Sequence, residues 1–294
     1  MGYLFLSAAL IFGAVKGFCG KKMSGYTTNI YSAALINLLR MAVCVLISFC
    51  VVIMSGNINN LSVSGKLLAA SALAGISTAS FIVTWLLSVK KSAYMMLDVF
   101  LMLGTLVPII SGQFLFSEAI TLRKIIGFVI LVAAVLIMCS YNNSIKAKFT
   151  PATVILLILC GLSNGVTDLS QKIATKTIDG LSVEIFNFYT YVFAALALLI
   201  FLAFIPRKEN MDNEKLTVAP IIYVLIMAGA LTANSYFKTQ AAFYLPSVEL
   251  YPLSQGLSLI LSTFMSTVFF KEKLKASAII GITLAFIALM IINL

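Results

Sequence analysis

The feature of this sequence that most limits its fold is a series of about ten apolar runs, each near the roughly 20 residues that span a bilayer. Lipid offers the backbone no hydrogen-bond partner, so continuous apolar runs of this length must be helical, whereas barrel strands would alternate. We therefore predict an all-α integral membrane protein with ten transmembrane helices. The runs cover residues 2–20, 29–54, 67–89, 93–117, 123–141, 151–171, 182–205, 217–240, 247–270 and 276–293.

Composition supports this interpretation. Hydrophobic residues make up 61% of the 294 residues and charged residues only 10%, against about 25% charged residues in soluble domains. Connections are short, the longest polar one being 206–215, so we expect no attached soluble domain. The first run lacks a basic leader and a small-residue cleavage site, so we interpret it as a retained helix. The net charge of +10 lies mostly in loops and indicates membrane topology, not nucleic-acid binding.

The sequence also contains an internal repeat. The segments 116–127 and 270–281 both leave an apolar run, make a polar turn and enter another run, with Glu118 and Glu272 separated by 154 residues. Lys21 and Lys172 match near the end of the first run of each half. An odd number of helices in each half forces the second half to be inverted. We predict two inverted five-helix repeats, residues 1–146 and 147–294.

These turns, with a glycine nine residues after each glutamate, resemble the drug/metabolite transporter superfamily in its ten-helix EamA-type branch. Phe12 and Gly13, followed by Lys21, are similar to the opening of that family's first helix. Phe12 stands where the family often has tryptophan, and Asp98 where it often has proline. The resemblance implies a central solute cavity surrounded by the runs 2–20, 67–89, 93–117, 151–171, 217–240 and 247–270. The runs 123–141 and 276–293 would support it.

Ionisable residues inside the runs are the first candidates for a solute site, because a charge in mid-membrane costs roughly 2.5–3.5 kcal/mol and usually faces a wet interior. We expect Lys16 and Arg40 to line the cavity or to pair with Asp98; the alternative is a salt bridge that only locks helices. Asp98 would hold a solute amine or a coupled proton. Lys238 and Glu249 lie near helix ends, where snorkelling is an equal alternative.

Polar seams add further candidates. Asp168 lies in the polar stretch 161–171, and Asn234 and Tyr251 lie in a second seam. Trp85 is either an interface anchor or a cavity wall. Glu118 is expected to cap a helix start. The predicted substrate-binding residues are Lys16, Arg40, Trp85, Asp98, Asp168, Asn234, Lys238, Glu249 and Tyr251.

We predict a secondary transporter of the cell (cytoplasmic) membrane that moves a small polar metabolite, favouring an amino-acid-like zwitterion, by alternating access. The chain has no GxxxxGK[ST] loop, so a proton or sodium gradient, or the solute's own, would drive it. Alternative solutes are an anionic or phosphorylated metabolite, drugs, and lipid-linked or nucleotide sugars. The alternative function outside transport is that of a membrane assembly partner. No enzyme, metal, cofactor or nucleic-acid partner is expected, because the chain has no histidine and no paired catalytic set. Solute, direction, coupling ion and oligomeric state stay open.

Two signals disagree on orientation. The resemblance implies that both termini lie in the cytoplasm. That orientation places five basic residues in cytoplasmic loops and twelve in outer loops, so the positive-inside rule favours both termini outside.

Overall fold

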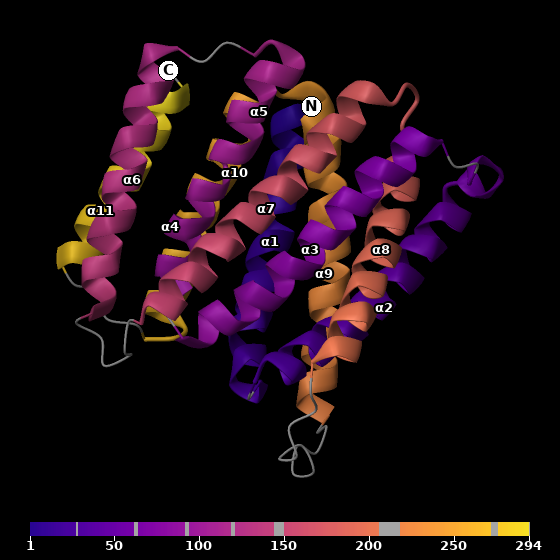
Figure 1. Ribbon diagram of the computed structural model, residues 1–294, viewed down its shortest axis with the longest axis horizontal. Helices are drawn as coiled ribbons and strands as arrows, with labels where there is room; N and C mark the ends of the chain where they lie inside the picture. Colours follow the sequence, from indigo (N-terminus) through magenta and orange to yellow (C-terminus); the bar gives the residue numbers. More distant parts are fainter. Residues whose placement is uncertain are drawn as a thin grey trace.

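Each apolar run of the sequence forms helix in the computed structural model (Figure 1). The structure describes residues 1–27, 29–61, 64–91, 94–118, 121–143, 150–205, 218–271 and 276–293, and no strand occurs in these ranges. Short 3-10 helices cover Ser24–Tyr26 and Asn57–Asn60. The α-helices are α1 (Gly2–Met23), α2 (Ile30–Met54), α3 (Gly65–Lys91), α4 (Tyr94–Gly104), α5 (Leu106–Phe116), α6 (Leu122–Asn143), α7 (Pro151–Thr177), α8 (Val183–Phe204), α9 (Val218–Tyr244), α10 (Ser247–Val268) and α11 (Ala276–Asn293).

Local sequence explains several helix starts. Asn29 precedes α2 and accepts a hydrogen bond from the Ser32 backbone at 2.8 Å, while the Ser32 hydroxyl accepts one from the Asn29 backbone at 3.1 Å. This reciprocal capping satisfies two donors that a helix start leaves open. Thr150 caps α7, and Pro151 takes the first helical position, where its missing N–H costs nothing.

The fourth run differs from the prediction, because it is two helices, α4 and α5, that meet at Thr105. Pro108 is the physical reason: its ring displaces the carbonyl four residues earlier, which belongs to Gly104, and it removes one backbone hydrogen bond. Pro252, by contrast, lies inside an unbroken α10.

Six described helices, α1, α2, α3, α7, α8 and α9, are long and apolar enough by themselves to cross a membrane. Shorter apolar stretches cover Phe100–Phe116 and Ile279–Ala288. The prediction of ten spanning helices is therefore supported directly for six elements.

The helices pair across the two halves of the chain. α1 packs on α9, α3 on α7, α2 on α8, α4 on α10, and α6 on α11. The last pair lies at one edge of the bundle, and both chain termini lie at the same end (Figure 1).

Glycines make the crossing of α4 and α7 unusually close. A Cβ atom on Gly104 would come within 2.0 Å of the Gly161 carbonyl oxygen, and one on Gly165 within 2.1 Å of the Gly104 carbonyl oxygen. Only hydrogen fits at these positions, as expected for small residues that bring membrane helices together.

Candidate solute site

A cavity of about 90 Å³ lies at the centre of the bundle, and we call it the first lobe. Its wall comes from α1, α3, α4, α7, α9 and α10, which are the helices that correspond to the six runs named from the family resemblance. Lys16 enters from α1, Asp98 from α4, Asn164 from α7 and Asn234 from α9. The α10 wall is polar, with Ser254, Gln255 and Ser258.

A second lobe of about 50 Å³ adjoins the first. Lys16, Phe81, Asn164, Asn234 and Lys238 line both lobes. The second lobe extends toward α8, where Thr190 and Tyr191 form its wall. We refer to the two lobes together as the central chamber.

Opposite charges face each other across the chamber. Asp98 is 6% exposed, lies beside Ser262 of α10, and is near the Lys16 ammonium. The Lys16 Nζ atom also lies 5.9 Å from the centre of the Phe81 ring, close enough for a cation–π attraction. Lys16 and Asp98 both come from the first half of the chain.

The second half contributes an ion pair. The Lys238 Nζ atom of α9 lies 2.6 Å from Asp168 Oδ1 of α7, with the two side chains 10% and 3% exposed. Tyr251 contacts both residues of this pair. Its hydroxyl donates to the Asp168 carbonyl oxygen at 2.7 Å, and its ring centre lies 5.4 Å from Lys238 Nζ. Tyr251 is fully buried and does not line either lobe.

Several polar atoms of the second lobe are buried without a hydrogen-bond partner among the described residues. They are Asn164 Nδ2, Asp168 Oδ2, Gln171 Oε1 and Thr190 Oγ1. An unpaired buried polar group costs about 1–3 kcal/mol, so water or a polar solute is expected to satisfy these atoms.

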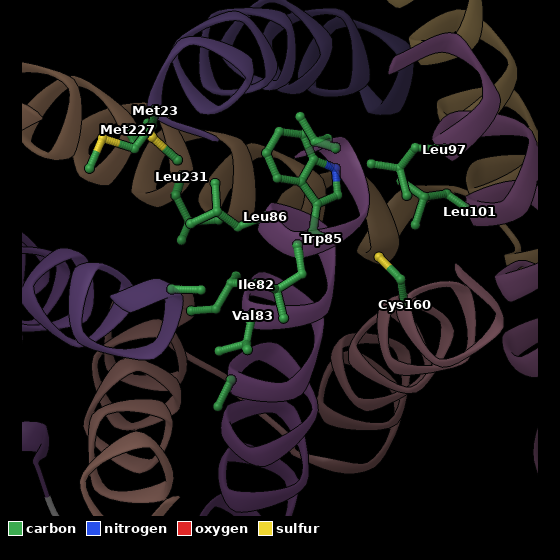
Figure 2. Close-up of a cluster of buried hydrophobic side chains, with 14 of the residues drawn as sticks. Met23, Ile82, Val83, Trp85, Leu86, Leu97, Leu101, Cys160, Met227 and Leu231 are labelled. Carbon is green, nitrogen blue, oxygen red and sulfur yellow. The ribbon is translucent and has the colours of Figure 1, made fainter. Parts of the chain in front are cut away.

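Trp85 lies at the cavity wall, which was one of its two predicted positions. Figure 2 shows its indole among apolar side chains, with Leu97 and Leu101 to one side and Leu86 to the other. A Cβ atom on Gly20 would come within 2.4 Å of the Trp85 ring. The glycine therefore makes room for the indole, which is 8% exposed.

Asn234 lines both lobes, and its side-chain amide donates to the Ala9 carbonyl oxygen at 2.6 Å, so it also joins α9 to α1. Of the predicted residues, the chamber thus brings together Lys16, Trp85, Asp98, Asp168, Asn234 and Lys238.

Arg40 and Glu249 lie elsewhere. Arg40 is 3% exposed in α2, near Tyr191, and does not line either lobe. The expected Arg40–Asp98 ion pair is not formed, because α2 packs on α8, α9 and α3 whereas α4 packs on α7, α10 and α6. Glu249, in the first turn of α10, accepts a hydrogen bond from the Tyr3 hydroxyl.

Sequence reasoning missed Phe81 and Gln171 as chamber residues. Phe81 gave no signal, because one phenylalanine in an apolar run looks like any other. Gln171 was inside the polar stretch that drew attention to Asp168, and its helical spacing of three residues from Asp168 places it on the same face.

A buried lysine and a partly buried glutamate contact the corner between α9 and α10. The Lys172 ammonium, 1% exposed, donates to the carbonyl oxygens of Ala242 at 3.1 Å and Leu245 at 2.6 Å at the end of α9. Glu118 accepts hydrogen bonds from the Ser247 backbone and hydroxyl, both at 3.3 Å, at the start of α10. Each charge matches the dipole of its helix end. Glu118 thus caps α10, which is distant in the sequence, whereas we expected it to cap the helix that follows its own turn. Glu272, its counterpart in the repeat, lies outside the described residues.

Comparison with known proteins agrees with this geometry. Residues 151–294 match the EamA-like transporter family. Among solved structures, 28 chains match; one crystal structure aligns with 99% of this chain and 95% of its own, with a TM-score of 0.69 and 12% identity. At this identity the likeness shows the fold alone. A search of curated proteins gave no match.

Proposed function

Residues 151–294 form an EamA-like transporter domain of an integral multi-pass membrane protein, and on this premise we propose a secondary transporter for a small polar metabolite. The EamA family implies membrane transport of small solutes. The finer proposal is that the solute is an amino-acid-like zwitterion, carried across the cytoplasmic membrane by alternating access.

The observation that carries this proposal is the polar central chamber. It is lined by seven described helices from both halves, and it contains buried charges of both signs and polar atoms without partners among the described residues. A solute carboxylate would interact with Lys16, and an amine with Asp98. Because the Lys238–Asp168 pair neutralises itself, Lys16 and Asp98 are the charges that a zwitterion would complement.

Chamber size favours a small solute over the larger alternatives. The two lobes of about 90 Å³ and 50 Å³ are well below the roughly 300–1,000 Å³ of sites that hold drug-sized molecules. Nucleotide sugars and lipid-linked sugars would require a much larger chamber.

An anionic metabolite is the second candidate, because cations outnumber anions around the chamber. Lys16 and Lys238 balance Asp98 and Asp168 along the chamber wall, and Arg40, which lies near Lys16 but outside that wall, adds a third positive charge. A phosphate ester that raises the unfolding temperature of the purified protein, where the matching zwitterion does not, would favour this candidate. Only ligands that bind the native state stabilise it.

Two inverted repeats, 1–146 and 147–294, are the architecture that we propose for this transport. Support comes from contacts that recur when the halves are exchanged. α1 packs on α9 as α7 packs on α3, while α2–α8 and α6–α11 pair with their own counterparts. Lys21 donates to the Val89 carbonyl oxygen near the end of α3, just as Lys172 does near the end of α9. The proposed boundary falls within 144–149, outside the described residues.

The test uses purified protein in lipid vesicles, with uptake or efflux of amino acids measured under imposed proton or sodium gradients. Asp98→Asn and Lys16→Gln are each expected to lower transport at least tenfold, since a charge-assisted contact contributes about 1.5–3 kcal/mol. Lys176→Gln, which changes an exposed lysine at the end of α7, is the matched control. Transport that stays unchanged in both chamber variants would refute the assignment. Arg40→Gln tests the buried arginine that lies near the chamber without lining it. Loss of transport at an unchanged unfolding temperature would indicate a role near the chamber, whereas a lowered unfolding temperature would indicate a role in folding.

A further inference from the structure

A second, very different cavity opens on the side of the bundle. It has a volume of about 250 Å³ and lies between α2, α8 and α9. Its wall includes Ile47 and Val51 of α2 and Gly229, Ala233 and Phe237 of α9. We call it the lateral groove. An apolar cavity of about 150 Å³ already binds benzene, so the lateral groove has room for a hydrocarbon segment.

Two polar residues in the middle of this groove bond their hydroxyl groups to the backbone of their own helices. The Ser48 hydroxyl donates to the Cys44 carbonyl oxygen at 2.7 Å, and the Thr232 hydroxyl donates to the Ala228 carbonyl oxygen at 3.0 Å. Their side chains therefore present methylene and methyl surface. Asn187 Nδ2 is the one described polar atom of the groove that is buried without a partner, against four in the second lobe, and this mostly apolar wall favours an apolar occupant.

The groove has a fixed shape. Phe237 stacks on Phe12 and Phe5 of α1, with ring centres 5.8 and 6.3 Å apart. At Gly229 an added Cβ would meet no atom within 4 Å, so the missing side chain is what leaves this part of the groove open.

One end of the groove carries a negative charge. Glu184, in the first turn of α8, accepts hydrogen bonds from the Ser182 hydroxyl at 2.7 Å and from the Tyr236 hydroxyl at 3.3 Å. Among the described residues it has no cationic partner. Gly229 lies about 10 Å further along α9 from Tyr236, at 1.5 Å per residue. An acidic site near a helix end thus leads into an apolar groove that runs toward mid-membrane.

We propose that the lateral groove binds one acyl chain of a membrane lipid whose head group carries an amine, with that amine at Glu184. The chain runs between α2 and α9 toward Gly229. Charge complementarity selects the head group, and the apolar wall selects the chain. The Ser235 hydroxyl donates to Asn187 Oδ1 at 3.0 Å between the groove and the second lobe, so the lipid lies beside the chamber without entering it.

The experiment titrates delipidated full-length protein in detergent with phosphatidylethanolamine or phosphatidylglycerol of identical chains, and counts bound lipids by native mass spectrometry. We expect one phosphatidylethanolamine to bind at about tenfold lower concentration than phosphatidylglycerol, the effect of one charge-assisted hydrogen bond. Gly229→Phe fills the groove and should abolish this tight binding. Ile222→Phe, at an exposed position two turns away on α9 that does not line the groove, should retain it. Glu184→Gln should bind both lipids equally.

Tight binding that survives in Gly229→Phe would overturn the proposal, and so would equal binding of the two lipids to the unchanged protein. A preference that persists in Glu184→Gln would overturn the assignment of the amine. Unfolding temperatures of all variants, compared with the unchanged protein, separate loss of binding from loss of fold. Phenylalanine favours helix more than glycine does, so Gly229→Phe should fold.

Discussion

The Lys238–Asp168 pair offers the sharpest test of how this bundle tolerates charge. Its atoms are 2.6 Å apart and nearly buried. At an effective dielectric constant of about 20, the attraction at this distance is about 6 kcal/mol. Removing both ions from water costs several kcal/mol each. The intact pair therefore contributes little net stability, but either charge left alone keeps its full burial cost.

Replacing Asp168 with asparagine should lower the free energy of unfolding by about 3–5 kcal/mol, the usual cost of leaving one partner of a buried pair behind. Lys238→Met should cost a similar amount. The double variant, Asp168→Asn with Lys238→Met, should cost much less than the sum of the two, because no unpaired charge remains.

Unfolding in mixed micelles can be followed by the fluorescence of Trp85, the single tryptophan of the chain, which lies at the chamber wall. The coupling energy between the two substitutions is the decisive quantity, since contacting residues deviate from additivity. Additive costs, or a cost below about 1 kcal/mol for Asp168→Asn, would refute the reasoning.

Three further predictions concern the scaffold. Gly165→Ala should lower the free energy of unfolding by about 1–3 kcal/mol, because its Cβ would clash with the Gly104 carbonyl. Gly229→Ala, where an added Cβ meets no atom, should raise the free energy of unfolding by up to about 1 kcal/mol. Equal effects of the two variants in chemical denaturation would contradict this. Lys172→Met should lower the free energy of unfolding by about 2–3 kcal/mol, because its hydrogen bonds to the end of α9 are lost. Lys176→Met, at an exposed position, should change it by no more than about 0.5 kcal/mol. Equal effects of the two variants in thermal unfolding would count against the corner contacts. Reporters fused to either terminus should be active on the same side of the membrane, and the active side settles the orientation; activity on opposite sides would contradict the fold.

The helices themselves were predictable from the sequence, because long apolar runs in lipid have one solution. The run 182–205, for example, became α8 at Val183–Phe204. The close approach of Gly161 and Gly165 was also predictable from residue size. The break at Thr105 was less visible, because Pro108 permits either a kink or a full interruption.

The partners of the buried charges were not predictable. Each helical residue points about 100° away from the previous one, so a small uncertainty in helix rotation changes which charges meet. Arg40 was expected to line the cavity or to pair with Asp98, yet it lines neither lobe, and α2 and α4 are not neighbours. Asp168 of α7 and Lys238 of α9 formed an ion pair instead. Glu118 shows the same limit, since its capping role was anticipated but the helix that it caps lies 129 residues away.

The glycine crossing of α4 and α7 has a mechanical consequence. Helices that interlock through side chains move in discrete steps, because each ridge must clear the next groove. At Gly104, Gly161 and Gly165 the closest contacts are between backbone atoms, so these three positions contribute no side-chain ridge. Asp98 on α4 and Asp168 on α7 thus lie on two helices that touch backbone to backbone, so this crossing resists a rotation of one helix against the other less than interlocked side chains would.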